Sequence, residues 1–232
     1  VNHYSGKSLN TASLKNKLFV FDIDGTLTDS VTMYLISVTR SLEALGIKDV
    51  DTDYNNYKHH TDSYALRYNY ERNFNASAPE HLLDDFENDL VHQMSAFNKV
   101  TEITGAKSAI QFFKDNEIPF CFATGALPKP AMIKLEQCDI WYDEQLLATS
   151  KTHESSEGFV LNAIEKAKVF YNKTEFDQII SVGDGLWDLK TAQNLSLDFV
   201  GIGDKNKTHL LQEGAEYCFS DMLAFKNHFT TV

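Results

Sequence analysis

Two aspartates spaced by one residue, at the end of an apolar run, are the residues best placed for chemistry in this sequence. Residues 18–21 are apolar and predict a buried strand, and Asp22 and Asp24 follow within three positions. Alternate residues of a strand point to the same side, so both carboxylates are expected to begin on one side. Gly25 lets the chain turn sharply after them. The alternative without chemistry is a pair of turn or helix-capping residues.

Such a pair suits the hydrolysis of a phosphate monoester, which is among the slowest uncatalysed reactions. A carboxylate nucleophile divides the reaction into two easier displacements. A second carboxylate can hold and return the proton that the leaving alkoxide needs. Because the nucleophile and the phosphate are both anionic, a cation has to lie between them.

The stretch from Leu18 to Asp29 resembles the signature of the haloacid dehalogenase-like (HAD) hydrolase superfamily, whose members are mostly phosphatases that form an aspartyl-phosphate. The resemblance implies that Asp22 is the nucleophile and Asp24 the general acid and base. It extends over essentially all of the chain after Asn16, and it is closest to the branch of phosphoglycolate phosphatases and β-phosphoglucomutases with a helical cap.

A second motif follows another apolar run, residues 118–123, which predicts a strand that ends at Thr124 and Gly125. In the family, a threonine or serine hydroxyl at this place holds the phosphate, with help from a neighbouring backbone N–H. The resemblance therefore implies a catalytic role for Thr124 and a substrate-binding role for Gly125. Taken alone, Thr-Gly after a strand is more often an ordinary turn.

A third strand is predicted over residues 178–182, and the sequence Gly-Asp-Gly-Leu-Trp-Asp follows at 183–188. This pattern resembles the metal-binding motif of the family, although a loop before an Asp-capped helix is the structural alternative. Mg²⁺ prefers oxygen ligands and keeps several waters, so one or two carboxylates and the substrate phosphate suffice. The resemblance implies a Mg²⁺ site formed by the carboxylates of Asp22 and Asp184 and by the backbone carbonyl of Asp24. Asp188 would bind the ion directly or orient one of its ligands.

The sequence departs from the family in the lysine that usually neutralises the nucleophile and the phosphate. That lysine often stands in a Lys-Pro pair before the helix predicted over residues 156–171, near His153, where this chain has no such pair. Lys151 lies just upstream and could reach the substrate. In some branches the lysine comes from the helix after the second motif, where Lys134 lies. We favour Lys134 as the catalytic lysine and keep Lys151 as a candidate substrate-binding residue.

Residues 30–98 contain no strand-like apolar run, and two apolar stripes at helical spacing predict helices there. The first begins at Val31, next to Asp29, which could cap the helix, and the second follows Pro79. The family places a helical cap domain here, so the resemblance implies a cap over residues 29–99. The core would then be discontinuous, formed by residues 1–28 and 100–232.

The segment from Tyr57 to Tyr64, with Arg67 and Arg72 after it, is rich in hydrogen-bonding and cationic side chains. Two readings of it stay open: part of it faces the phosphate pocket and contacts the leaving group, or it is a solvated, aromatic-rich helix face.

Strands and helices alternate outside this insertion, which predicts an α/β fold: a Rossmann-like parallel sheet with helices on both faces and a short last strand over 198–201. The chain has 232 residues, a net charge of −12 and no basic run, which argues against nucleic acid and anionic membranes as partners. Three cysteines without a CxxC pattern suit a reducing compartment, and no apolar run reaches the length of a membrane span, so a cytoplasmic location is expected.

We therefore expect an enzyme, a Mg²⁺-dependent HAD-like phosphatase that hydrolyses a small phosphate monoester. A phosphomutase of the β-phosphoglucomutase type uses the same intermediate, and a phosphate-binding sensor without catalysis could keep the same fold. Both stay open as alternatives. The sequence leaves the substrate and the oligomeric state undetermined.

Overall fold

A six-stranded sheet, parallel throughout, forms the centre of the computed structural model, which describes residues 11–230. Residues 1–10 and 231–232, which the sequence analysis assigns to the core domain, lie outside the described residues. From edge to edge the strands are β5 (Leu147–Ala148), β4 (Phe120–Ala123), β1 (Lys17–Phe21), β6 (Gln178–Gly183), β7 (Asp198–Ile202) and β8 (Tyr217–Phe219). The predicted Rossmann-like α/β fold is confirmed.

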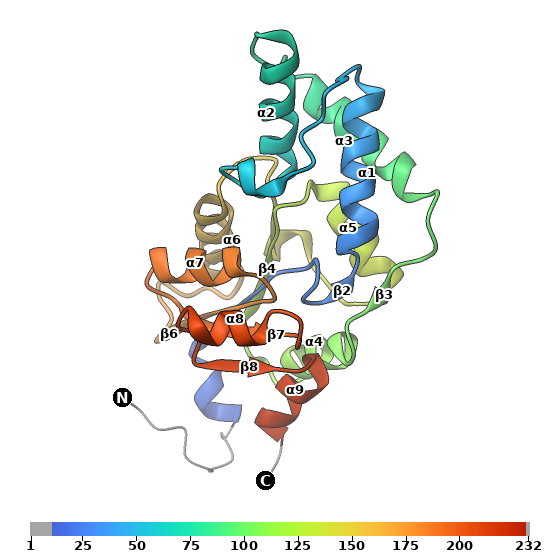
Figure 1. The fold of residues 1–232 in the computed structure, drawn as a ribbon. Helices are drawn as coiled ribbons and strands as arrows, with labels where there is room; N and C mark the ends of the chain where they lie inside the picture. Colours follow the sequence, from blue (N-terminus) through green and yellow to red (C-terminus); the bar gives the residue numbers. More distant parts are fainter. Residues whose placement is uncertain (1–10, 231–232) are drawn as a thin grey trace.

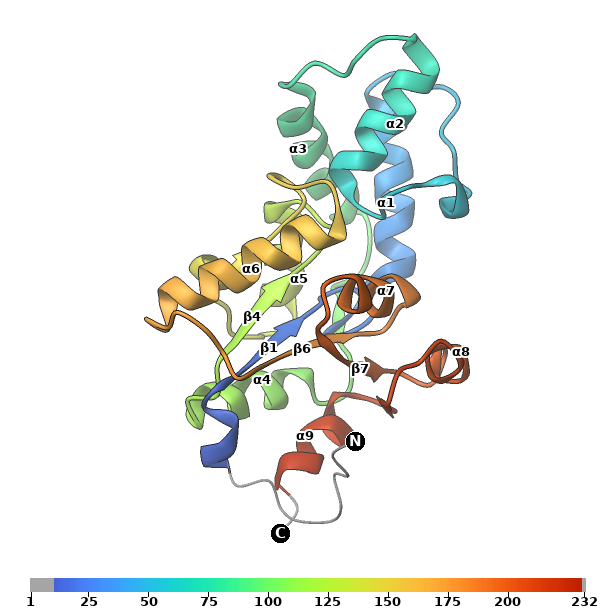
Figure 2. The same ribbon diagram turned by 90° about the vertical axis from the view of Figure 1, so that its left-hand side faces the viewer.

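The apolar run of β1 is buried on both faces of the sheet because successive side chains point to opposite sides. Phe19 and Phe21 belong to one cluster of buried side chains, and Leu18 and Val20 belong to another. The first cluster includes side chains of α4 (Ala106–Asp115), α5 (Pro128–Gln137) and α9 (Met222–Thr230). The second includes side chains of α6 (Ser156–Phe170), and α6 also contacts α7 (Leu186–Asn194). Helices thus cover both faces, as Figure 2 shows for α4 and α6 on either side of β1 and β4.

Phe113 of α4 occupies the middle of an aromatic cluster on the first face. Its ring centroid lies 4.7 Å from that of Phe19, 5.4 Å from that of Phe21 and 6.0 Å from that of Phe225. Edge-to-face and offset contacts of this kind add to the gain from burying the rings. Phe113 is fully buried, so this cluster fixes α4 and α9 against the central strand.

Between β1 and β4 the chain forms a group of helices beyond the carboxyl end of the sheet (Figures 1 and 2). They are α1 (Val31–Ala44), the short 3₁₀ helix η2 (Tyr54–Asn56), α2 (Asp62–Phe74) and α3 (Leu82–Met94). Two short antiparallel strands, β2 (Thr28–Asp29) and β3 (Thr101–Glu102), pair where the chain leaves the sheet and where it returns. We call α1, η2, α2 and α3 with their connections the helical insertion.

Several details differ from the predictions. Asp29 does not cap α1 but lies exposed in β2, and Ser30, which precedes α1, donates its hydroxyl to Asp24 and accepts no N–H of the helix with its side chain. The helix predicted after Pro79 begins at Leu82. The strand over 198–201 is not the last, because β8 follows it at the edge of the sheet. Strands β5 and β8 have only two and three residues, too few to show a period in the sequence.

The remaining elements are η1 (Thr11–Leu14), η3 (Glu144–Leu146) and α8 (Lys207–Gln212). Among the described helices none combines the length and the apolar character needed to cross a membrane.

We expect Phe113→Ala to lower the free energy of unfolding by about 3–5 kcal/mol, because it leaves a cavity among six other aromatic rings. Urea unfolding followed by circular dichroism measures the change. Phe74→Ala is the matched control: its side chain is 46% exposed, and its loss should cost less than about 1 kcal/mol. Equal losses in the two variants would contradict the central role of Phe113.

Candidate active site

The carboxyl ends of three neighbouring strands bring the predicted site residues to one cavity. Asp22 and Asp24 follow β1, Thr124 follows β4, and Asp184 follows β6. All four line a cavity of about 350 Å³ between the sheet and the helical insertion. Open α/β sheets bind their ligands at this edge because the loops there diverge from adjacent strands.

Three carboxylates form a tight cluster at the sheet side of the cavity. One oxygen each from Asp22, Asp184 and Asp188 lies within 4.8 Å of the other two. The pairing of β1 with β6 sets this distance, because the Asp22 N–H donates to the Val182 carbonyl at 2.9 Å. Gly25, at φ +86°, also permits it, since a Cβ there would lie 2.6 Å from an Asp184 carboxylate oxygen. The cluster therefore depends on strand register and on a glycine turn.

The electrostatics of the cluster are those of crowded negative charges. Desolvation, and then the neighbouring Asp188, Asp184 and Asp24 carboxylates, raise the pKa of Asp22 well above its usual range. The pKa of Asp184 rises to about 7 through desolvation and the charges of Asp188 and Asp24. Desolvation raises the pKa of Asp188 to about 6, although backbone N–H donors oppose this. The Lys205 charge lowers the pKa of Asp184 but does not cancel this effect.

The donor set of this cluster fits a small, hard divalent cation such as Mg²⁺. Three carboxylates supply oxygen ligands, and the open cavity leaves room for water and a phosphate. The carboxylate of Asp24 is not part of the cluster, so any contact of Asp24 with a metal would come through its backbone carbonyl.

Asp24 forms a buried ion pair with Lys134 of α5. The Lys134 Nζ lies 2.7 and 2.6 Å from the two Asp24 carboxylate oxygens, and its side chain is fully buried. Its ammonium also lies 3.4 Å from the ring centroid of Tyr34, in a cation–π contact. Within residues 11–230, Lys134 forms no ion pair with Asp22, the residue that the family lysine is expected to neutralise.

Lys151 lies elsewhere, in ion pairs with two acidic residues of α3. Its Nζ is 2.8 Å from Asp84 and 3.0 Å from Glu87, and it is not among the residues that line the cavity. Glu87 also accepts the Lys129 N–H at 2.9 Å. Lys151 thus connects the helical insertion to the loop after β5.

A second network, which the sequence did not reveal, lies next to the Lys134–Asp24 pair. The Tyr34 hydroxyl donates to the buried Asp62 carboxylate, which also accepts the Leu127 N–H at 2.8 Å. Burial raises the pKa of Asp62 to about 6, although the Tyr34 hydrogen bond and Lys134 lower it. In the sequence, Tyr34 belongs to the apolar stripe that begins at Val31 and predicts a helix. A tyrosine there, rather than a phenylalanine, was the available signal.

Thr124 and Gly125 lie where the helical insertion meets the sheet. The Thr124 hydroxyl accepts the Ala126 N–H at 3.1 Å, which orients it at the cavity wall. Gly125 accepts the Asp62 N–H at 2.9 Å, and a Cβ on it would lie 2.5 Å from the His60 carbonyl. A side chain at position 125 would therefore push the insertion away from the sheet.

Some residues of the segment 57–64 line the cavity, whereas the two arginines that follow the segment form ion pairs outside it. Tyr57, His60, Thr61 and Asp62 line the cavity, whereas Arg67 and Arg72 do not. Arg67 pairs with Glu154 at 2.9 Å, and Arg72 pairs with Asp49 at 3.0 Å. Tyr57 and His60 thus contribute rings to the cavity, while Arg67 joins the insertion to the core and Arg72 forms its ion pair within the insertion.

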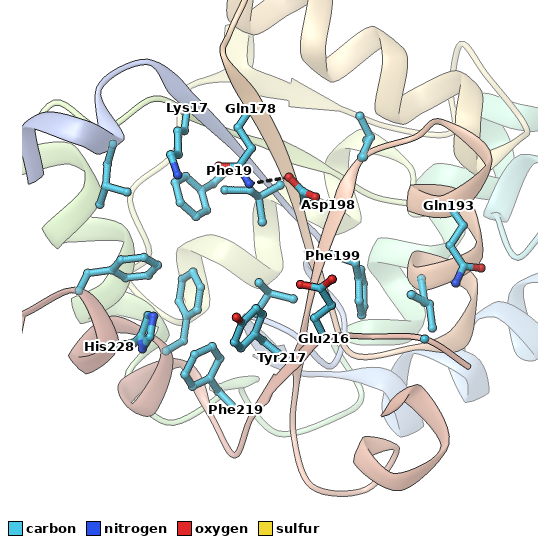
Figure 3. Close-up of a pocket in the computed structure, with 18 residues that line it drawn as sticks. Lys17, Phe19, Gln178, Gln193, Asp198, Phe199, Glu216, Tyr217, Phe219 and His228 are labelled. Carbon is cyan, nitrogen blue, oxygen red and sulfur yellow. Dashed lines mark hydrogen bonds between the residues drawn. The ribbon is translucent and has the colours of Figure 1, made fainter. Parts of the chain in front are cut away.

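A second cavity, of about 220 Å³, lies at the opposite end of the sheet. Figure 3 shows Lys17, Gln178 and Asp198, the first residues of β1, β6 and β7, at its wall, with a hydrogen bond between Gln178 and Asp198. None of Asp22, Asp184 and Asp188 lines this cavity. The cavity at the carboxyl ends of the strands is therefore the candidate active site.

Comparison with known proteins agrees with this geometry. No protein of curated function matches the sequence significantly. A hydrolase from Pseudomonas syringae has 20% sequence identity and a TM-score of 0.68, with 93% of this chain and 99% of that chain covered. A candidate beta-phosphoglucomutase from Bacteroides vulgatus has 16% identity and a TM-score of 0.67, with 93% and 88% covered. CbbY from Rhodobacter sphaeroides, in complex with phosphate, has 16% identity and a TM-score of 0.66, with 88% and 94% covered.

At these identities the solved structures establish a shared fold. The sequence itself matches the family model of the haloacid dehalogenase-like hydrolases over residues 19–202, a span that contains all three motifs and the helical insertion. The chain therefore belongs to the haloacid dehalogenase-like hydrolase family.

Proposed function

We propose that this protein is a Mg²⁺-dependent phosphatase that hydrolyses a small phosphate monoester through an aspartyl-phosphate on Asp22. The observation that carries the proposal is the cluster of Asp22, Asp184 and Asp188, whose oxygens lie within 4.8 Å of one another in an open cavity. Such a cluster is costly to fold without a cation, and it faces the residues needed for phosphoryl transfer.

Asp22 attacks the phosphorus, and the bond from phosphorus to the alcohol oxygen breaks. Thr26 donates its hydroxyl to Asp22 Oδ2 at 2.9 Å, which holds the carboxylate and leaves Oδ1 for the attack. Asp24 has to carry a proton when the ester is bound, so its ion pair with Lys134 would hold the carboxylate between turnovers and open in this step; Asp24 then gives the proton to the departing alkoxide. It then takes a proton from water, whose oxygen attacks the phosphorus, so that Asp22 is regenerated and inorganic phosphate leaves.

Asp22, Asp184 and Asp188 would hold the Mg²⁺ ion, with the Asp24 backbone carbonyl as a further ligand. When bound, the ion offsets the charge of the carboxylates and of the phosphate. The Thr124 hydroxyl and the Gly125 backbone would hold the phosphoryl oxygens. Lys134 fixes the Asp24 carboxylate and offsets its charge, and this contact supports a role for Lys134 in catalysis.

The helical insertion would form a cap domain over residues 29–99. Its contacts with the core support this role: Asp62 binds Gly125, and Thr61 donates to the Glu154 carbonyl at 2.8 Å. A cap that covers the cavity excludes water and strengthens the electrostatic contacts within it. We assign Lys151 to this contact between cap and core, because its ion pairs reach Asp84 and Glu87 of α3.

Replacing either aspartate of the first motif should separate their roles. Asp22→Asn should abolish turnover, because the amide does not attack phosphorus. Asp24→Asn should lower turnover of alkyl phosphates about 100-fold or more. It should lower turnover of p-nitrophenyl phosphate less, because that leaving group needs little protonation. Steady-state kinetics on both esters measures this, with circular dichroism as the control for folding. Equal losses of Asp24→Asn on the two substrates would remove Asp24 from the acid role.

The two candidate lysines should differ strongly. Lys134→Met should lower kcat at least ~100-fold, since it leaves Asp24 unpaired and removes a positive charge at the reacting groups. Lys151→Met, the matched control, should change kcat less than about threefold, because Lys151 lies outside the cavity in ion pairs with Asp84 and Glu87 of α3. Thermal unfolding of both variants shows whether they fold. The reverse order of the two effects would transfer the role to Lys151.

Magnesium should raise the melting temperature, and more at about pH 7.5 than at about pH 5. The raised pKa values, about 7 for Asp184 and about 6 for Asp188, mean that the metal-free folded protein holds protons which the unfolded chain has released. Its stability therefore falls as the pH rises from about 4 to about 7. Mg²⁺ competes with these protons, so its effect grows over the same window.

Thermal shift assays with and without Mg²⁺ at both pH values test this, with Asp184→Ala as the control variant. A wild type without a magnesium-dependent shift would contradict the metal assignment. So would an Asp184→Ala variant that responds as strongly as the wild type.

A further inference from the structure

The candidate active-site cavity has two ends of different chemistry. Its sheet end carries the aspartate cluster and Thr124, as described above. Its far end is formed by the helical insertion, where four aliphatic side chains from α1 and α2 line it: Val31, Leu35, Val38 and Ala65. A phosphate bound at the sheet end would direct the rest of its substrate toward this apolar end.

Four ring side chains form a continuous wall along the same cavity, and we call this set the aromatic ladder: Tyr57, Tyr54, His60 and Trp187. The centroids of Tyr57 and Tyr54 lie 4.9 Å apart with an angle of 27° between the rings. Tyr54 and His60 are 6.4 Å apart at 29°, and His60 and Trp187 are 3.5 Å apart at 24°. Successive rings are thus close to parallel, and the ladder reaches from the insertion to α7.

The far end offers no positive charge to a second anionic group. Among the described residues that line the cavity, Lys205 is the one lysine, and no arginine occurs. Lys205 lies near the other end, next to Asn206, whose side-chain amide donates to the Asp184 carbonyl at 2.9 Å. Burial lowers the pKa of His60 to about 4, so its ring is uncharged at neutral pH.

The arginines of the insertion are engaged elsewhere. Arg67 and Arg72 form the ion pairs described above, and Arg40 lies over the ring of Phe97, at 5.5 Å. The ammonium of Lys134 is already neutralised by Asp24, and Asp62 adds a carboxyl group to the cavity wall. A carboxylate or second phosphate placed here would lose its hydration without gaining a counter-charge.

We infer that the site takes phosphate monoesters of uncharged alcohols that carry a flat, largely apolar ring, rather than bisphosphates or phosphorylated acids. The inference rests on the proposed phosphatase function and adds the class of leaving group. The phosphate supplies the single anionic group and binds at the sheet end. The ring packs among the aliphatic side chains of α1 and stacks edge-to-face on the cavity side of the aromatic ladder, whose ring faces cover one another, and flat rings make this contact better than puckered ones.

The direct test compares benzyl phosphate with phosphoglycolate. Both are esters of primary alcohols, so the difference in kcat/KM reports recognition of the organic part. We expect benzyl phosphate to be favoured at least about tenfold. Cyclohexylmethyl phosphate, apolar but puckered, should be at least about twofold poorer than benzyl phosphate. A phosphoglycolate value equal to or above that of benzyl phosphate overturns the inference, and equality of the two apolar esters overturns the stacking part.

Two variants place the effect in the cavity. Leu35→Lys adds a cation at a side chain that lines the cavity and is 37% exposed, and it should shift the ratio of the two kcat/KM values toward phosphoglycolate by about tenfold. Leu161→Lys on α6, 49% exposed and outside the cavity, is the matched control and should leave the ratio unchanged. Tyr54→Leu should raise KM for benzyl phosphate and leave that for phosphoglycolate nearly unchanged. An unchanged ratio in Leu35→Lys overturns the inference.

Binding measurements separate this inference from the proposed function. Calorimetric titration of Asp22→Asn with both esters, in Mg²⁺, reports affinity without turnover, while steady-state kinetics of the wild type reports hydrolysis. If no ester is hydrolysed, the phosphatase proposal fails, yet tighter binding of benzyl phosphate still supports the substrate class. If esters are hydrolysed but phosphoglycolate binds as tightly, the phosphatase proposal stands and the substrate class fails.

Discussion

The mutual repulsion of Asp22, Asp184 and Asp188 is the constraint around which this structure is organised. Three carboxylates within 4.8 Å oppose folding at neutral pH, and the raised pKa values of Asp184 and Asp188 express that opposition. The pairing of β1 with β6 and the apolar clusters on both faces of the sheet hold the carboxylates together despite it. The packing of the sheet thus offsets the unfavourable free energy of this cluster at its carboxyl edge. A cation and a phosphate bound there would relieve the repulsion.

A second set of charged contacts connects this edge of the sheet to the helical insertion. Lys134 is fully buried, which is tolerable because Asp24 pairs with it and the ring of Tyr34 covers it. Tyr34 belongs to α1 and also donates to Asp62 of α2, which binds the Leu127 N–H. Moving the insertion would therefore expose or unpair the group that fixes Asp24. The position of the insertion and the charge of the general acid and base are physically coupled.

The sequence predicted those parts of the site that depend on strand ends. Asp22, Thr124 and Asp184 each follow an apolar run, and parallel strands bring such positions to one edge. It favoured Lys134 over Lys151 but could not establish that choice, because it depends on which lysine the packed helices bring to Asp24. It also missed the Tyr34–Asp62 contact, which joins positions 28 apart through the crossing of two helices. Strands β5 and β8 escaped prediction because two or three residues carry no period.

The net charge of the chain and the lining of its cavity both affect which substrates can bind. A net charge of −12 repels anions over roughly the Debye length, about 8 Å in physiological salt, so a substrate with several anionic groups would approach unfavourably. A single phosphate meets compensating charge only once it reaches the cation site. Burial of an apolar ring, in contrast, does not depend on the sign of the surrounding field. In an acidic protein, contacts with the aromatic ladder therefore add affinity for the substrate without further positive charges. The metal site then remains the place in the cavity where an anionic group is most strongly attracted.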